Sequence, residues 1–258
     1  MNKEGPVVTI IAICYNHEKY CQQTLDSIKN QSYNNWELFI VDDFSTDESN
    51  KIINHWITEN KQVKLTFIPN KSNQGICNSL NKTIPLANGK YIVLIACDDI
   101  MFIDRIKEQV LDLESKNSDY ALSCSNFNNI DEKGVFLSIG FDNTFNFPYK
   151  SVFDSILINN DRAGIIIHSA TVLARTEVIK SFLPYPSHII QEDLYMWLSI
   201  SAKYKVSYLN KPLIDYRILP NSLSRDPAKM ESLYLDRILV VNEFKADYQE
   251  KKQIIQKH

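Results

Sequence analysis

The stretch Tyr91–Asp104, YIVLIACDDIMFID, determines how the rest of the chain is interpreted. Its first part, Tyr91–Ala96, is an unbroken apolar run rich in β-branched residues, which predicts a strand buried on both faces of a parallel sheet. The run ends in two adjacent carboxylates, Asp98 and Asp99. Such groups at the edge of a core are costly unless they are paired, hydrogen-bonded or bound to a metal. A ligand site at the strand end is therefore one interpretation. A solvated turn that starts a helix is the other.

Strands and helices alternate through the sequence before Tyr91. Ser45-Thr46-Asp47-Glu48 has the pattern of a capping box, with Ser45 as the helix cap. The β-α-β-α-β-α-β order predicts a parallel sheet with right-handed crossovers. The expected elements are strands over Val7–Ala12, Trp36–Val41 and Val63–Ile68, and helices over Glu18–Asn30, Asp47–Glu59 and from the Asn73-Gln74-Gly75 turn to Leu86.

The second half of the sequence is less regular. We expect an amphipathic helix over Asp104–Lys116 and a hairpin turn at Asp131-Glu132-Lys133-Gly134. The remaining expected strands cover Tyr120–Asn126, Val135–Ile139, Ile165–Leu173, Val206–Leu209 and Leu213–Ile218, and further helices begin at Thr176 and Gln191 and run from Pro227 to His258.

Composition is that of a globular protein with enough length for a sizeable core. The chain has 258 residues, 44% hydrophobic and 23% charged, which fits one large domain or two small ones. Its net charge of −3 and isoelectric point near 6.0 do not indicate a general nucleic-acid binder. The five cysteines are an odd number without a Cys-x-x-Cys pair, which favours a reduced cytoplasmic chain without a zinc site.

The beginning of the sequence is interpreted as a first strand and not as a signal peptide. Glu4 and Pro6 precede the apolar run, Asn16-His17-Glu18 ends it, and no small-residue cleavage site follows. No stretch approaches the roughly 20 apolar residues that a membrane span requires. Any membrane contact would therefore be peripheral.

Three acidic features stand at comparable places. Asp42-Asp43 and Asp98-Asp99 end two expected strands of the sheet, and Glu192-Asp193 begins a helix. Parallel strands end on one rim, so the first two pairs can converge. The ordered motifs VTIIAICYNHEKY, QSYNNWELFIVDDFSTD, NQGICNSLNKTIPLANGKYIVLIACDD and QEDLYMWL resemble the family 2 glycosyltransferases of the GT-A fold. The resemblance runs from about Val7 to Arg105 and resumes at Gln191 and at Tyr216-Arg217.

The resemblance implies a nucleotide-sugar site along the first half. Tyr15 matches the position that packs on the nucleotide base, although a capping core aromatic is the alternative. Asp43 matches the carboxylate that accepts a hydrogen bond from the uracil ring, and Asp42 is expected to hold its loop. Positions that match the family's donor-nucleotide site are Ala12, Tyr15, Asn16, Asp43, Asn73, Gly75 and Asp98.

By the same resemblance, Asp98 lies near the ribose hydroxyls and Asp99 holds a manganese or magnesium ion on the diphosphate. A hard cation on oxygen ligands would neutralise the charge that builds on the leaving group. Arg105 is expected to form a structural ion pair. Two positions depart from many relatives: Ala96 replaces an Asp, and Leu219 replaces a His after Tyr216-Arg217. Both departures imply weak metal binding that the diphosphate completes.

Asp193 matches the catalytic base of the family, with Glu192 orienting it or binding the acceptor. One carboxylate suffices in an inverting transfer, because it removes the acceptor proton as the hydroxyl attacks opposite the departing diphosphate. A charged first helical turn is the alternative for both residues. The histidines have no metal-ligand spacing, and His168 alone is kept as a weak acceptor contact.

The leading hypothesis is thus a metal-dependent inverting glycosyltransferase that uses a nucleotide donor, with UDP expected, and a glycan or lipid-linked glycan acceptor at the cell surface. The alternative is a non-catalytic nucleotide- or glycan-binding protein on the same fold. A phospho-acceptor receiver domain fits poorly, because the first acid pair ends the second strand. A nucleotidyltransferase would usually need a glycine-rich basic loop where this chain has CYNHEKY.

The expected organisation has three parts. Residues 1–105 form a nucleotide-sugar-binding half, 106–226 an acceptor-binding and catalytic-base half of the same domain, and 227–258 a C-terminal helical segment. Lys251, Lys252 and Lys257 lie near Ile254 and Ile255, so this segment is either a peripheral membrane contact or a solvated helix that covers the domain. The expected location is the cytoplasm, with the inner face of the membrane as an option.

Overall fold

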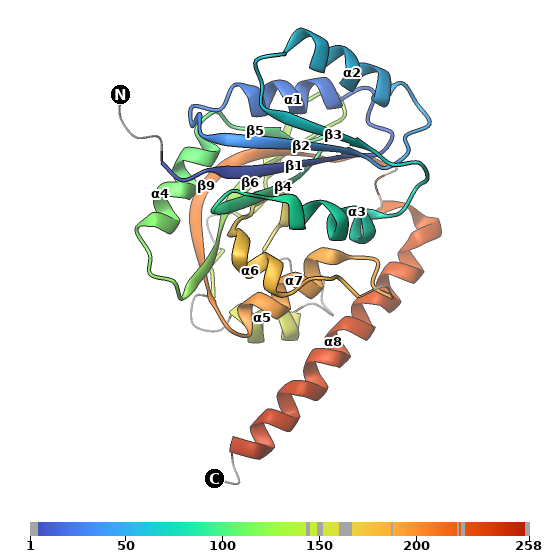
Figure 1. Ribbon diagram of the computed structural model, residues 1–258. Helices are drawn as coiled ribbons and strands as arrows, with labels where there is room; N and C mark the ends of the chain where they lie inside the picture. Colours follow the sequence, from blue (N-terminus) through green and yellow to red (C-terminus); the bar gives the residue numbers. More distant parts are fainter. Residues whose placement is uncertain are drawn as a thin grey trace.

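The computed structural model describes residues 5–142, 145–148, 152–159, 167–186, 188–220, 222 and 225–255. Within them, nine strands form one continuous sheet with the order β3-β2-β1-β4-β8-β6-β9-β5, and β7 pairs with β6 (Figure 1). Helices cover both faces of this sheet. The architecture is the expected α/β fold, a mostly parallel sheet flanked by helices with a smaller mixed region and a C-terminal helix.

The first four long strands form the parallel part of the sheet. These are β1 (Val8–Cys14), β2 (Trp36–Asp42), β3 (Leu65–Pro69) and β4 (Tyr91–Ala96). Ile13 of β1 is in register with Val41 of β2 and with Ala96 of β4. The three strands therefore end together, and the acidic residues that follow β2 and β4 meet on one rim.

Two apolar clusters, one on each face of the sheet, hold the helices in place. Successive residues of β1, such as Ile10 and Ile11, belong to opposite clusters, because successive side chains of a strand point to opposite faces of the sheet. Helices α1 (Cys21–Lys29), α2 (Ser49–Glu59) and α4 (Arg105–Glu114) pack on one face. The other face carries α3 (Ile76–Thr83) with η1 (Ile84–Leu86), α5 (Val152–Asn159), α6 (Thr176–Ser181), α7 (Glu192–Ser201) and α8 (Pro227–Ile255).

The mixed part of the sheet continues from β4. Strand β8 (Leu173–Arg175) is antiparallel to both β4 and β6 (Tyr120–Ile130). Strand β9 (Lys205–Arg217) is parallel to β6 and antiparallel to β5 (Ile100–Met101), which directly follows the Asp98-Asp99 pair. The hairpin partner of β6 is β7 (Phe136–Ile139). The sheet thus runs without interruption through both expected halves.

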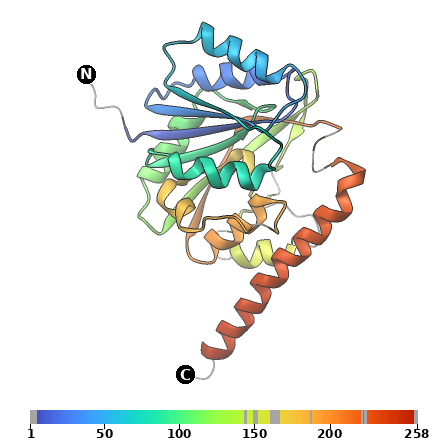
Figure 2. The same ribbon diagram turned by 45° about the vertical axis from the view of Figure 1, so that its right-hand side comes forward.

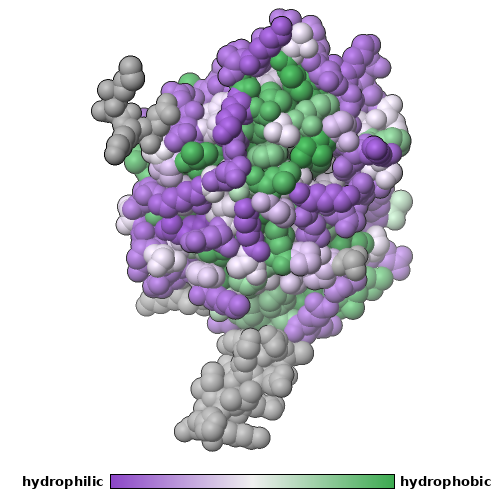
Figure 3. Space-filling model, in the orientation of Figure 1, coloured by the Kyte–Doolittle hydropathy of each residue, from purple (hydrophilic) through white to green (hydrophobic). Residues whose placement is uncertain are grey.

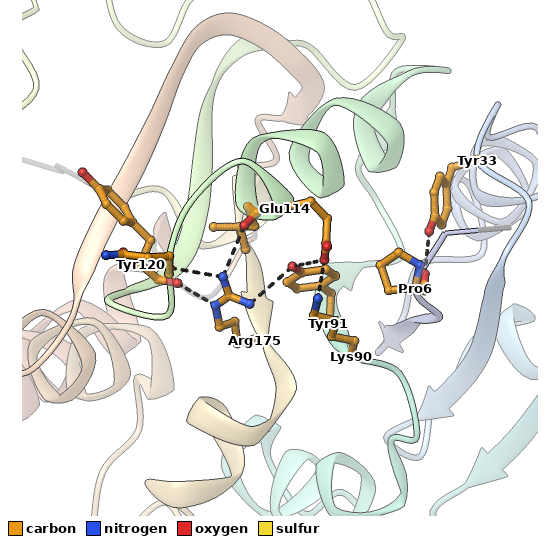
Figure 4. Close-up of polar contacts among 9 residues, drawn as sticks. Pro6, Tyr33, Lys90, Tyr91, Glu114, Tyr120 and Arg175 are labelled. Atoms are coloured by element: carbon orange, nitrogen blue, oxygen red, sulfur yellow. Dashed lines mark hydrogen bonds and ion pairs between the residues drawn. The ribbon is translucent and has the colours of Figure 1, made fainter. Parts of the chain in front are cut away.

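Arg175 fastens the junction between the parallel and mixed parts (Figure 4). Its guanidinium donates to the Tyr120 and Leu113 carbonyl oxygens at 2.8 and 3.2 Å and to the Tyr91 hydroxyl at 3.4 Å. Glu114 accepts hydrogen bonds from Tyr91 Oη at 2.6 Å and from Lys90 Nζ at 2.5 Å. These contacts lie around the beginning of β4, away from the rim that carries the acidic pairs, and they stabilise the fold.

Three local expectations are wrong. Helix α2 begins at Ser49 without a side-chain cap, because Ser45 donates its hydroxyl to Asp42 instead of capping the helix. In the expected strand Ile165–Leu173, the described residues include the short helix η3 (Ser169–Thr171), and of these described residues only Leu173 belongs to a strand. The two expected strands after Val206 are one strand, β9, which bends at register irregularities.

Several expectations fall on parts of the chain outside the description. Ile165, Ile166 and Lys257 lie outside the described residues, and so do the side chains of Lys251 and Lys252. The membrane contact expected from these lysines therefore stays a prediction. All five cysteines are buried and free.

Helix α8 leaves the body of the molecule. Its N-terminal part packs on the helical layer that contains α5 and α7, and its C-terminal part extends past the domain (Figures 1 and 2). Among the described residues, no helix is long and apolar enough to cross a membrane.

The surface seen from the side of Figure 1 is mainly hydrophilic. An apolar area lies over the β3 and β2 region of this face (Figure 3). Strand β3 is the edge of the sheet, and its Leu65, Phe67 and Ile68 are only half-buried. This edge is less well covered than the strands that carry the acidic rim.

Substitution of Gly89 by Ala should destabilise the protein. A Cβ at Gly89 would lie 2.5 Å from Thr9 N and 2.8 Å from the Val7 and Tyr91 carbonyl oxygens, all of which are backbone atoms of β1 or β4 or next to them. We expect a loss of about 1–3 kcal/mol and a melting temperature lower by roughly 3–10 °C, measured by calorimetry. Leu86→Ala, at a residue 49% exposed, is the control and should change little. Equal melting temperatures for both variants would contradict the prediction.

Candidate active site

Asp43 anchors the loop that follows β3. Its Oδ1 accepts hydrogen bonds from Gln74 N at 3.0 Å and from Asn70 Nδ2 at 2.8 Å, and its Oδ2 accepts one from Gly75 N at 2.9 Å. Gly75 has a φ of 76°, a conformation that an L side chain rarely adopts. The structure thus brings Asp43, Asn73 and Gly75 together, as the sequence indicated, and Asp43 fixes the shape of the loop.

Tyr15, Asn16 and Phe44 occupy the loops that follow β1 and β2. Asn16 and Phe44 have positive φ values of 58° and 66°, which for Phe is strained. Asn16 Oδ1 accepts a hydrogen bond from Thr46 N at 2.8 Å and so ties the two loops together. Tyr15 and Phe44 are 43% and 47% exposed. Two aromatic rings are therefore available at the rim, where the sequence indicated Tyr15 alone.

Ala12 and Asp42, which lie beside these loops, make contacts that stabilise the fold. Ala12 is completely buried in the cluster that packs against α1. Asp42 accepts hydrogen bonds from the Ser45 hydroxyl and, at 3.3 Å, from the Ser45 N–H. The expectation that Asp42 holds its loop is confirmed.

Asp98 and Asp99 lie at the end of β4 with different surroundings. Asp99 is 1% exposed, and its Oδ1 accepts a hydrogen bond from Arg217 N at 3.0 Å. Asp98 is 9% exposed, and its Oδ2 lies 3.8 Å from His17 Nε2. Ala96 is exposed on the same strand end. Asp98 therefore presents its carboxylate to the rim, whereas Asp99 sits deeper and is held by β9.

Two buried arginines compensate the charge of this pair. Arg217 donates from Nε to the Asp98 carbonyl oxygen at 2.9 Å, and its guanidinium lies 4.7 Å from the Tyr20 ring centre. Arg105 is completely buried and hydrogen-bonds with Gln109 and with the Val172 carbonyl oxygen. The ion pair expected for Arg105 is not among the salt bridges of the described residues, although its charge opposes the rise in the pKa of Asp99.

Burial raises the pKa of both carboxyl groups. For Asp99 the desolvation is reinforced by repulsion from Asp98, and the pKa lies well above its usual range. For Asp98 desolvation also dominates, opposed by His17 and Arg217. A divalent cation next to the pair would stabilise both in the charged form.

Glu192 and Asp193 form the first turn of α7. Asp193 Oδ1 accepts a hydrogen bond from Leu194 N at 2.7 Å, and its Oδ2 accepts one from Ser169 Oγ at 3.3 Å. Burial raises the pKa of Asp193, and burial together with the Asp193 charge raises the pKa of Glu192 to about 8. The pKa of Glu192 thus lies in the range for proton transfer near neutral pH, and the pKa of Asp193 is shifted in the same direction.

A short chain of contacts connects the Asp98-Asp99 pair with Asp193. Tyr216 adjoins Arg217, and its ring lies 4.4 Å from the His168 ring, which in turn precedes Ser169. The His168 ring also lies 4.3 Å from that of Phe127, and burial lowers the pKa of His168 to about 4. A neutral histidine thus stands between the two acidic sites. The rim and the start of α7 belong to one continuous region.

Comparison with known proteins identifies the family of this chain. Residues 9–175 match the family model described as glycosyl transferase family 2. The chain belongs to this family. The protein is therefore a glycosyltransferase, and the resemblance found in the ordered motifs is confirmed.

Two relatives cover most of the glycosyltransferase. TuaG of Bacillus subtilis (strain 168), a glycosyltransferase named for teichuronic acid biosynthesis, is 27% identical over 230 residues, which are 89% of this chain and 86% of TuaG. The uncharacterized glycosyltransferase MJ1057 of Methanocaldococcus jannaschii is 30% identical over 237 residues, 90% of this chain and 77% of MJ1057.

Solved structures share the GT-A fold. S. aureus TarS 1-349 in complex with UDP-GlcNAc has a TM-score of 0.65 at 16% identity, over 92% of this chain and 71% of that one. The mannosyltransferase PcManGT from Pyrobaculum calidifontis, in complex with GDP-Man and Mn2+, has a TM-score of 0.64 at 14% identity, over 95% and 75%. At these identities the likeness concerns the fold.

Sequence reasoning missed some residues that the structure places at the site. The spacing of His17 indicates no role in the sequence, although its Nε2 lies 3.8 Å from the Asp98 carboxylate in the structure. Phe44 stands inside the quoted motif VDDFSTD, and its exposure beside paired acids was the available indication. Arg217 was noted only as part of Tyr216-Arg217, and no local pattern shows that its side chain crosses to the end of β4.

Arg217→Lys should destabilise the fold. The guanidinium also donates to the Asp131 and Glu132 carbonyl oxygens at 3.0 and 3.1 Å, and a lysine cannot satisfy all these acceptors. We expect a loss of about 3 kcal/mol in urea unfolding, because buried acceptors lose their partners. Lys133→Met removes an exposed charge from the same turn and serves as the control. A variant as stable as the wild type would refute this role of Arg217.

Proposed function

We propose that the glycosyltransferase moves a sugar, with inversion, from a nucleoside diphosphate donor, with a UDP-sugar expected, to a hydroxyl group of a glycan or lipid-linked glycan. The observation that carries the proposal is Asp193, a buried carboxylate with a raised pKa, joined through Ser169, His168 and Tyr216 to the Asp98-Asp99 pair. A base and a diphosphate-side acid pair in one region are what a single-displacement transfer requires.

The donor nucleotide is proposed to lie across the ends of β1 and β2. The exposed rings of Tyr15 and Phe44 offer apolar faces to a planar base. The loop Asn73–Gly75, fixed by Asp43, would cover the base and ribose. Asp43 already accepts hydrogen bonds at both oxygens, so recognition of a uracil N–H would use a remaining lone pair or require the loop to shift. Ala12 and Asn16 would contribute to donor binding by fixing the shape of the loop that follows β1.

A divalent cation is proposed to bind at Asp98 and Asp99. Carboxylate oxygens are the ligands that Mn²⁺ and Mg²⁺ prefer, and the single hydrogen bond at Asp99 leaves Oδ2 for a ligand. The described residues contain no group of three or more His, Cys, Asp or Glu that could hold a metal ion. The protein ligands therefore fit a cation whose coordination is completed by the diphosphate. Once bound, the cation would supply charge neutralisation at the leaving group.

Asp193 is proposed to remove the proton from the acceptor hydroxyl. Its two hydrogen bonds, to Leu194 N and Ser169 Oγ, fix the direction of the carboxylate. Glu192, with a pKa of about 8, would be protonated at neutral pH and could donate a hydrogen bond to the acceptor. The acceptor oxygen, losing its proton to Asp193, attacks the anomeric carbon from the side opposite the diphosphate, which leaves with the electrons of the broken C–O bond. No covalent intermediate with the enzyme is therefore needed.

The name of one relative supports the proposed acceptor class. TuaG is named for the synthesis of teichuronic acid, a cell-surface polysaccharide. We infer a growing cell-surface glycan as the acceptor here. Transfer would take place on the cytoplasmic side, with α8 as the element that could touch the inner face of the membrane.

A panel of nucleotides should identify the donor base and the metal dependence. We expect one of UDP, GDP, dTDP and CDP, and not AMP, to raise the melting temperature in the presence of Mn²⁺ or Mg²⁺. A ligand at a hundred times its Kd stabilises by about 2.7 kcal/mol. Asp98→Asn and Asp99→Asn should remove the metal-dependent part, whereas the exposed control Glu132→Gln should keep it. A flat response to all nucleotides would favour a binding protein of another specificity.

Asp193→Asn should abolish transfer without affecting donor binding. We expect a decrease in kcat of about 10²- to 10⁴-fold, the usual contribution of a general base. In the wild type, activity should rise with pH through the raised pKa of Asp193, because the base must be ionised. Release of UDP from UDP-GlcNAc and of GDP from GDP-mannose over a pH series measures both effects. A fully active Asp193→Asn enzyme would exclude Asp193 as the base.

A further inference from the structure

The loop that leads into α7 is held by a residue of the C-terminal helix. Asp236 of α8 is 3% exposed, and its Oδ1 accepts a hydrogen bond from Ile190 N at 2.9 Å. Its Oδ2 accepts a second from Gln191 N at 3.0 Å. Helix α7 has no side-chain cap of its own at Gln191. Asp236 therefore holds, from far along the chain, the backbone of the N-cap residue Gln191 and of Ile190 before it, and its negative charge lies at the N-terminal end of α7.

The same loop is fixed from the opposite side by α3, the helix that follows the donor loop. Asn81 of α3 donates to the Tyr185 carbonyl oxygen at 3.1 Å and accepts from Tyr185 N at 2.7 Å. Cys77 Sγ lies 3.5 Å from the Ile189 carbonyl oxygen. The segment before Glu192 is thus clamped between α3 and α8, and its position depends on both.

Charged and polar groups from several elements surround the two acids of α7. Asp236 and Arg237 come from α8, Cys77 from α3 and Tyr185 from the loop, and Ser169 of η3 donates to Asp193. The negative charge of Asp236 contributes to the high pKa of Glu192, after desolvation and Asp193. The positive charge of Arg237 opposes the rise in the pKa of Asp193. The two neighbours on α8 thus act in opposite directions on the two acids.

We propose that Asp236 is a positioning residue for the catalytic base. Asp236 holds the backbone N–H groups of Ile190 and Gln191, the two residues directly before α7, so the direction of Asp193 relative to the donor depends on α8. Helix α8 then contributes to the geometry of the active site in addition to packing on the domain. The proposal rests on the proposed function of Asp193.

The first test is Asp236→Asn, which keeps the shape but replaces one acceptor oxygen by an amide that cannot accept a hydrogen bond from an N–H. We expect kcat for UDP or GDP release from UDP-GlcNAc or GDP-mannose to fall on the order of ten- to a hundred-fold, since small misplacements of a catalytic group have such effects. The KM for the donor and the affinity for the nucleoside diphosphate should be unchanged. Glu231→Gln, an exposed acid on the same helix, is the matched control.

The pH profile separates this role from a purely structural one. Loss of the Asp236 charge should move the alkaline limb of the activity profile, which the proposed function assigns to protonated Glu192, to lower pH, because Asp236 is one of the charges that raise the pKa of Glu192. Hydrogen exchange at the Ile190 and Gln191 amides should be faster in Asp236→Asn than in Glu231→Gln.

The outcomes distinguish this proposal from the proposed function. If Asp193→Asn is inactive while Asp236→Asn keeps the wild-type kcat and pH profile, the positioning role is wrong and the base assignment stands. If Asp236→Asn does not fold, hydrogen exchange at the Ile190 and Gln191 amides of the wild type as fast as in an unstructured peptide overturns the proposal, because Asp236 would then not hold these N–H groups. If the wild-type protein releases neither UDP nor GDP, or if Asp193→Asn is fully active, the proposed function and this inference both fail.

Discussion

The structure depends on the burial of an arginine and two aspartates where β4 and β9 meet. Arg217 and Asp99 are 2% and 1% exposed, and the Arg217 N–H binds the Asp99 carboxylate while its guanidinium binds the Asp98 carbonyl oxygen. Such charges are tolerated in a core only when each has close partners. The same residues join the end of the parallel part of the sheet to β9 in its mixed part, so fold stability and the geometry of the acidic rim are coupled.

A second constraint lies in the loops at the ends of the parallel strands. Asn16 and Phe44 adopt positive φ values, and the surrounding hydrogen bonds to Thr46 and Ser45 hold the two loops in place. Strain of this kind persists only where neighbouring structure enforces it, and it is common at binding sites. Here it keeps two aromatic rings exposed beside the anchored Asp43 loop. The site is therefore largely formed by the fold itself.

The acceptor side is built differently, from elements that are distant in sequence. Asp193 of α7 is fixed by Ser169 of η3, and the loop before it is fixed by Asn81 of α3 and Asp236 of α8. Because α3 also follows the Asn73–Gly75 loop, this loop and the segment before α7 share one supporting helix. The buried acids obtain their raised pKa values from this enclosure, since desolvation is the leading cause for both Glu192 and Asp193.

The sequence by itself determined the parallel half of the fold and the location of the acidic pairs. Strand β4 was predicted at its observed bounds, because an apolar β-branched run that ends in two carboxylates is a local pattern. The tertiary structure alone decided which side chains meet these acids. The capping box at Ser45 was wrong because Asp42, a neighbour in the sequence, takes the Ser45 hydroxyl. The described part of the expected strand Ile165–Leu173 was wrong because the packing around His168 overrode local preference. The roles of Arg217 and Asp236 were invisible for the same reason: their partners lie 118 and 46 residues away in sequence, and only folding brings them into hydrogen-bonding distance.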